Sequence, residues 1–187
     1  METRQNGKIN LVVKFIMLIF AVSKTTFMGY THYWDIKKKS TAETRKNFAS
    51  AVEELKKIYA SLPRTTQSAG GCYPRHKVVI KNGMGVGNPT FNDHLINFNG
   101  NAKNGTDHEG FHIDLNGRNE WNFCKTARKP YDLLVCCSLI ALANNSTTEL
   151  FKFSSDGTLA DWKQAIALYT SVTGREVPQR ILNWIKK

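Results

Sequence analysis

Alternating apolar and polar positions predict the first strand of the chain. Residues 29–36 are rich in strand formers, and their alternation places Tyr30, His32 and Trp34 on one face. Two of these three side chains carry polar groups that can take part in chemistry. We therefore expect a strand that both contributes to the core and presents Tyr30 and His32 to a site.

Apolar residues at helical spacing predict two helices in the first three quarters of the chain. The first begins at Ser40-Thr41-Ala42-Glu43, which is typical of a capping box with Ser40 as the cap, and ends at Pro63. The second spans residues 130–144, with Pro130 in its first turn. Because it is apolar nearly all round, we expect it to be the central buried helix.

A third helix is predicted near the C-terminus. Thr158 is its expected N-cap with Asp161 at the third position, and Gly174 is expected to end it. A short helical segment follows Pro178.

Short segments rich in β-formers and bounded by turn residues such as Asn99-Gly100 predict the remaining strands. They are residues 77–81, 94–98, 110–115, 120–125 and 150–153. Residues 64–76 are predicted to form a loop. The consecutive strands are predicted to form an antiparallel meander. The element order predicts a single α+β domain, with a mostly antiparallel sheet and about three helices packed on one of its faces.

Residues 1–27 are predicted to be an extension that precedes a domain spanning residues 28–187. Their uninterrupted apolar run, residues 15–22, is far shorter than the roughly 20 residues that cross a bilayer, so we expect no stable membrane insertion. The favoured interpretation is that translation naturally begins at Met28. A weak secretory signal or a membrane-surface helix is the alternative.

The composition fits one soluble globular domain: 187 residues, of which 41% are hydrophobic. The formal net charge of +11 favours anionic partners such as nucleic acid, nucleotide phosphates or an acidic surface. A solvated basic face without a partner is the alternative. The cations are spread along the chain, so no long basic arm is predicted.

The four cysteines include no C-x-x-C pair, and Cys136-Cys137 lies in the apolar helix. We interpret them as free buried thiols, which fits a reducing compartment, and we expect neither a metal nor a cofactor. A disulfide involving Cys72 is an alternative that spacing leaves open.

His108-Glu109-Gly110-Phe111-His112 matches H-E-x-x-H, the zinc-protease signature. That chemistry requires a helix, whereas the apolar residues here alternate and Asn116-Gly117 ends the run. We therefore predict a strand and no metal site. The alternating glycines of residues 83–87 are followed by Asn88-Pro89 rather than by a helix, so they predict a hairpin connection and not a phosphate loop.

Residues 123–132 form the stretch with the most specific chemistry. Lys125, Arg128 and Lys129 lie at the entrance of the apolar helix, where the helix dipole already disfavours cations. A bound phosphate or carboxylate would offset this cost, with Thr126 as a hydroxyl donor and Arg128 as a planar fork. The alternative is that these side chains lie in solvent and pair with Asp132.

Further candidates come from other elements. They are Tyr30 and His32 in the first strand, His108 and Glu109 before the 110–115 strand, and Ser155 and Asp156 at the last strand-to-helix junction. At that junction, capping of the helix is the alternative role. If the site is catalytic, His32 or Glu109 is the expected base, and Arg128 would stabilise developing phosphoryl charge.

Several of these segments occur together in a known family. They are residues 28–34 (MGYTHYW), residues 98–100 (FNG), His108-Glu109 followed by Phe111, residues 123–132 (FCKTARKPYD) and residues 154–157 (SSDG). In this order the chain resembles an uncharacterised family of small proteins from bacteriophages and bacteria, over residues 28 to about 174. The resemblance implies a start at Met28 and a cytoplasmic location in a bacterium or infected host, and it implies no activity. Residues 1–27 and His112 depart from the family pattern.

The sequence therefore predicts a polar pocket for a phosphate-bearing or other anionic small molecule, such as a nucleotide. Whether the pocket binds this molecule or also hydrolyses it is left open. A nucleic-acid-binding protein that uses its basic surface is one alternative. A structural or host-interaction protein without a catalytic site is another.

Overall fold

The fold is seen in a computed structural model that describes residues 29–37, 41–67, 74–117 and 122–185. The elements are β1 (Thr31–Ile36), α2 (Ala42–Ala60), β2 (Thr65–Gln67), β3 (Pro74–Lys77), β4 (Thr90–Phe91), β5 (Leu95–Phe98), η1 (Ala102–Asn104), β6 (Phe111–Asp114), β7 (Asn122–Lys125), α3 (Asp132–Asn144), β8 (Phe151–Ser155), α4 (Leu159–Thr173) and α5 (Gln179–Ile185). The predicted single α+β domain is confirmed. Our predictions for residues 1–27, Ser40 and Cys72 fall outside the described residues.

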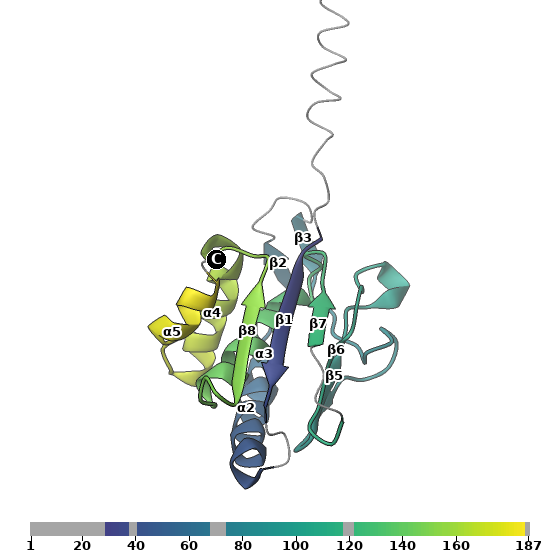
Figure 1. Ribbon diagram of the computed structural model, residues 1–187. Helices are drawn as coiled ribbons and strands as arrows, with labels where there is room; N and C mark the ends of the chain where they lie inside the picture. Colours follow the sequence, from purple (N-terminus) through teal and green to yellow (C-terminus); the bar gives the residue numbers. More distant parts are fainter. Residues whose placement is uncertain (1–28, 38–40, 68–73, 118–121, 186–187) are drawn as a thin grey trace, which may run out of the picture.

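The central sheet has the order β7-β1-β8, and β1 runs antiparallel to both neighbours (Figure 1). His32 lies opposite Cys124 of β7 and Ser155 of β8. Tyr30, His32 and Trp34 are all buried, as the alternation predicted. Their common face is the one that the helices cover.

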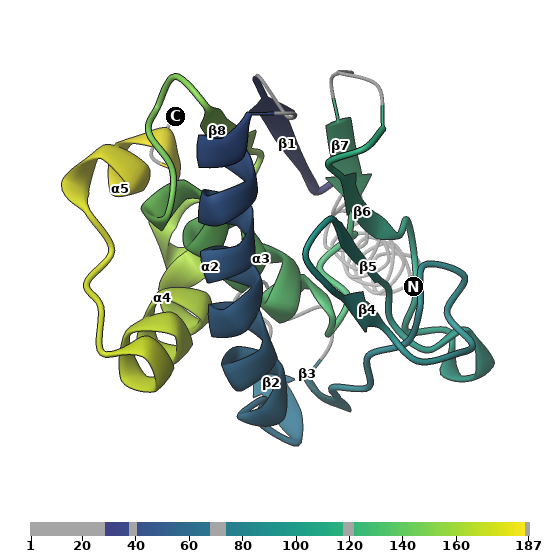
Figure 2. The same cartoon turned by 90° about the horizontal axis from the view of Figure 1, so that it is seen from below.

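Helices α2, α3 and α4 lie together on one side of this sheet (Figure 2). Helix α3 is the centre of the core, since every residue from 133 to 143 is buried. It has no polar face because α2, α4 and the sheet surround it, as its uniform apolar sequence predicted. Within the described part of the chain, no helix is long and apolar enough to cross a membrane.

The strands do not form one meander, and this part of the prediction is wrong. β4, β5 and β6 form a separate antiparallel sheet, whereas β7 leaves them and pairs with β1. The predicted loop 64–76 contains the short pair β2-β3. The predicted strand 77–81 is also wrong, since β3 ends at Lys77 and Lys81 makes only an isolated bridge to Asn99. Local β-propensity indicates where a strand can form but not which strand it pairs with.

The helix ends agree with the sequence to within two residues. Thr41 caps α2, since its hydroxyl accepts from the Thr44 backbone N–H at 3.1 Å. Helix α3 begins at Asp132, because Pro130 and the residue after it form the turn that leads into the helix.

The predicted ends of α4 are confirmed. Asp161 accepts from the backbone N–H of Thr158 at 2.8 Å, and Gly174 adopts the left-handed conformation (φ 67°).

The buried position of α3 predicts a large stability loss when its side chains are shortened. Leu139→Ala should lower the free energy of unfolding by about 2–5 kcal/mol, since Leu139 is fully buried and its removal leaves a cavity. Leu168→Ala on α4 is the matched control, and because Leu168 is only partly buried its loss should be clearly smaller. Denaturant unfolding measures both values, and equal losses would contradict the central position of α3.

Candidate functional site

The turn between β7 and α3 is held against the start of β1. The backbone N–H groups of Thr126 and Ala127 both donate to the Tyr30 carbonyl oxygen, at 3.0 and 3.3 Å. Ala127 (φ 50°) and Arg128 (φ 56°) are both left-handed, although neither is glycine. This conformation costs roughly 1–2 kcal/mol per residue, so the surrounding contacts must hold it in place.

The left-handed turn places Arg128 over an aromatic ring. The guanidinium carbon lies 4.0 Å from the centroid of the Tyr30 ring, which is a cation–π contact. Arg128 Nε donates to Asp161 Oδ1 at 3.4 Å, a long bond. The same Asp161 carboxylate caps α4. Arg128 therefore connects β1 to the start of α4, and its predicted pairing with Asp132 is not what the structure shows.

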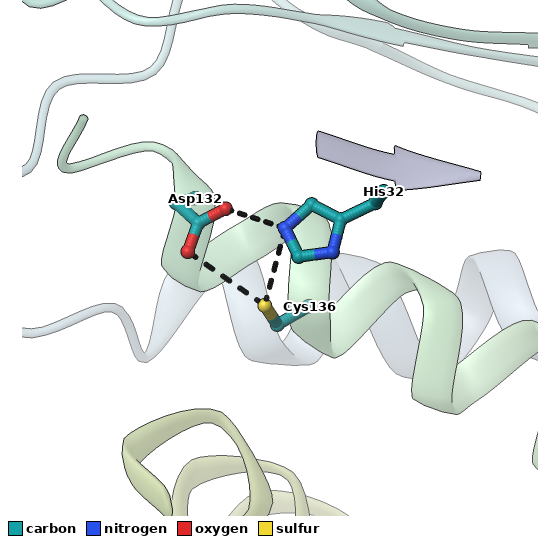
Figure 3. A group of neighbouring side chains, drawn as sticks. All are labelled: His32, Asp132 and Cys136. Carbon is teal, nitrogen blue, oxygen red and sulfur yellow. Dashed lines mark hydrogen bonds and ion pairs between the residues drawn. The ribbon is translucent and has the colours of Figure 1, made fainter. Parts of the chain in front are cut away.

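A buried polar cluster lies next to this turn (Figure 3). His32 Nε2 and Asp132 Oδ1 are 2.7 Å apart, and Cys136 Sγ lies 3.8 Å from His32 Nε2 and 3.8 Å from Asp132 Oδ2. The Thr126 hydroxyl donates to Asp132 Oδ1 at 2.6 Å. Asp132 and Cys136 are four residues apart on α3, which puts both on the helix face that meets β1. The three donor groups lie close enough together to hold a metal ion.

Burial controls the protonation of the Cys136 thiol and of the Tyr30 hydroxyl. Desolvation raises the pKa of the Cys136 thiol well above its ordinary value, and the Asp132 carboxylate raises it further, so the thiol is neutral. Desolvation likewise raises the pKa of Tyr30. Among the described atoms, His32 Nδ1 and the Tyr30 hydroxyl are buried without a hydrogen-bond partner. Trp34 Nε1 is a third such atom, and such groups are uncommon in protein interiors.

The cluster is not a Cys-His-Asp catalytic triad. In a triad, one imidazole nitrogen faces the nucleophile and the other faces the carboxylate. Here Asp132 and Cys136 both approach Nε2 of His32, and Nδ1 faces neither (Figure 3). Together with the neutral thiol, this arrangement gives no activated nucleophile.

A small cavity opens beside the cluster. Its lining includes Tyr30, Arg128, Asp132, Cys136 and Asp161, and its volume is about 40 Å³. A water molecule needs roughly 10–15 Å³ of such volume, so the cavity can hold about three groups of the size of a water molecule. This volume suits a phosphoryl or carboxylate group but not a nucleobase.

The structure brings four of the predicted site residues together. Tyr30 and Arg128 line the cavity, while His32 and Thr126 are hydrogen-bonded to Asp132 at its edge. Their elements meet because the β7–α3 turn is tied to Tyr30.

Lys129 also lines the cavity. The other predicted residues do not, and they mostly support the backbone. The Glu109 carboxylate accepts from the Lys125 backbone N–H at 2.7 Å, and the Asp156 carboxylate accepts from the Thr31 backbone N–H at 3.0 Å. The Ser155 hydroxyl accepts from the backbone N–H of Gly157 at 2.9 Å and from the indole N–H of Trp162 at 3.3 Å, so it holds the turn before α4, which Thr158 and Asp161 cap.

His108 lies exposed in the loop before β6, and the side chain of Lys125 lies against Gly29. The H-E-x-x-H match spans this loop and the strand β6, with His112 exposed, so the prediction that it is not helical is confirmed.

The sequence prediction missed Asp132, Cys136 and Asp161 as site residues. In the sequence, Asp132 is a partner for the neighbouring cations, Cys136 a buried thiol of the apolar helix and Asp161 a capping group. The four-residue spacing of Asp132 and Cys136 was the available signal, but it points to a site only once His32 is known to face them.

Comparisons with known protein families, with curated proteins and with solved structures find no match. The resemblance to a bacteriophage and bacterial family thus stays a prediction. The function must be argued from the geometry of the site.

The left-handed turn predicts an unusual response to glycine. Ala127→Gly should raise the free energy of unfolding by about 0.5–1 kcal/mol, because glycine adopts φ 50° without steric cost. Ala167→Gly, at an exposed position inside α4, is the control and should lower it by about 1 kcal/mol. Chemical denaturation gives both values. If Ala127→Gly destabilises the protein as much as the control does, the turn is not strained as described.

Proposed function

We propose that the chain binds a small anionic molecule through a phosphoryl or similar group placed in the cavity beside Arg128. The observation that carries this proposal is the position of Arg128. Its strained backbone holds the guanidinium over Tyr30 at a cavity of about 40 Å³. Strained backbone at a cavity that contains a fixed cation is a common feature of ligand sites.

The electrostatics of Arg128 support an anionic ligand. A guanidinium has five N–H donors, and in the structure one of them makes a long hydrogen bond of 3.4 Å to Asp161. The side chain is 34% exposed, so a ligand can reach it. An incoming phosphate could accept bidentate hydrogen bonds from the fork in the way that carboxylates and phosphates do. The net charge of +11 would favour the approach of such a ligand.

The size of the cavity limits which part of a ligand can enter it. Only the anionic group fits inside, so the remainder of a nucleotide-like ligand would lie outside, against the β7–α3 turn. Binding is favoured over hydrolysis by the chain alone, because His32, one of the two predicted bases, is already hydrogen-bonded through Nε2 to the Asp132 carboxylate. Glu109, the other predicted base, is bonded to the β7 backbone.

The proposal predicts that Arg128 is needed for ligand binding and is not needed for folding. Isothermal titration calorimetry with inorganic phosphate and a panel of nucleotides should show one site per chain. Arg128→Ala should weaken it at least about tenfold, since a hydrogen bond to a charged group contributes about 1.5–3 kcal/mol. The melting temperature should fall only slightly, because the ion pair to Asp161 is long at 3.4 Å and a partly exposed cation–π contact contributes about 0.5–1 kcal/mol.

Arg45→Ala is the matched control, since it removes the same charge from an exposed position on α2. It should leave the affinity unchanged. Two results would overturn the proposal: no binding by any compound of the panel, or equal losses in both variants. Equal losses with a steep dependence on salt would instead indicate nucleic-acid binding through the basic surface.

A further inference from the structure

We propose that His32, Asp132 and Cys136 form a binding site for a divalent transition-metal ion of the zinc type. One donor atom from each side chain lies within 4.8 Å of the other two. The donors come from β1 and from one face of α3, which are rigid elements of the core (Figure 3). The inference does not depend on the anion site, since the metal is expected to bind without any anion.

The distances between the donors are close to those of a tetrahedral site. Zinc binds nitrogen and oxygen at about 2.0 Å and sulfur at about 2.3 Å. In a tetrahedral site, these bond lengths place the nitrogen about 3.5 Å from the sulfur and about 3.3 Å from the oxygen. The observed distance from His32 Nε2 to Cys136 Sγ is 3.8 Å. The contact of 2.7 Å between His32 and Asp132 is a direct hydrogen bond, and it would open by roughly 0.6 Å around an ion. A side-chain movement of this size requires no change in the fold.

The chemistry of the donors selects the class of metal. Thiolate and imidazole are ligands of zinc and its transition-metal neighbours, whereas magnesium and calcium require oxygen ligands. The Cys136 thiol is neutral without metal, so binding of the ion requires this thiol to release its proton to solvent. The divalent ion then balances the two negative charges of the Cys136 thiolate and the Asp132 carboxylate. The buried site would then be neutral, which removes the cost of an unpaired charge in the core.

One neighbouring group supports the same assignment. His32 would bind the ion through Nε2, the nitrogen that faces Asp132, and its proton would then move to Nδ1. The Thr126 hydroxyl donates to Asp132 Oδ1 at 2.6 Å, and such a bond to a ligand carboxylate is typical of the outer shell of a metal site.

The three protein ligands leave a fourth position open. Sites with three protein ligands and an open position are typical of zinc that binds water or a substrate, whereas structural zinc has four protein ligands. Asp132 and Cys136 also line the cavity that contains Arg128. A water molecule or an oxygen of the proposed anion in this cavity would therefore lie beside the ion.

Cobalt(II) is the probe for the test, because a thiolate ligand gives it a charge-transfer absorption band that oxygen and nitrogen ligands do not give. The full chain is freed of metal with a chelator, titrated with cobalt(II) and then with zinc(II). We expect one cobalt ion per chain, a thiolate band, and loss of that band when zinc displaces cobalt. Magnesium should produce no change. Absence of binding, or binding without a thiolate band, would overturn the proposal.

The variants identify the ligands. Cys136→Ser should abolish the thiolate band, and Asp132→Asn should weaken cobalt binding by about 100-fold or more, since even outer-shell changes cost about 10–100-fold. Cys137→Ser is the matched control and should keep the band, because Cys137 Sγ points to the Ala165 carbonyl oxygen instead.

A band that survives in Cys136→Ser would place the metal elsewhere and overturn the assignment. Circular dichroism checks that each variant folds. If Cys136→Ser does not fold, the thiolate band of the unaltered chain and the loss of cobalt affinity in Asp132→Asn test the metal site instead. Phosphate binding is measured separately through Arg128→Ala, so failure of the metal site and failure of the anion site are distinguishable.

Discussion

The buried hydrogen bond between His32 and Asp132 connects the two elements on which the site depends. His32 is fully buried near the start of β1, and Asp132 is the first residue of α3. Their contact of 2.7 Å fixes the start of the central helix against the central strand. Leaving both groups unpaired in the core would be costly, so this bond constrains how β1, the β7–α3 turn and α3 can be arranged together.

The strained turn follows from the same constraint. The chain has to pass from the end of β7 at Lys125 to the start of α3 at Asp132 while Thr126 reaches the Asp132 carboxylate. Two left-handed residues complete this short connection, and the second of them, Arg128, is directed over Tyr30. The junction between β7 and α3 therefore positions the cavity, the Arg128 guanidinium and the cluster of His32, Asp132 and Cys136.

The sequence predicted the elements much better than the site. Periodicity located β1, α2, α3 and α4, because a buried stripe leaves a regular pattern in the sequence. It could not show that β7 pairs with β1, since partner choice depends on tertiary packing. The importance of residues 123–132 was predicted from their charges, and the structure places Thr126, Arg128 and Asp132 at the site. Glu109 and Ser155 were misleading, because a polar side chain that holds the backbone looks the same in sequence as one that faces a ligand.

A double-mutant cycle on His32 and Asp132 tests the central claim most directly. The free energy of unfolding is measured for the metal-free chain, for His32→Phe, for Asp132→Ala and for the double variant. We expect a coupling free energy of at least about 1 kcal/mol, within the range of about 0.5–3 kcal/mol for residues in direct contact. Additive losses, with a coupling close to zero, would contradict the claim that this bond joins β1 to α3.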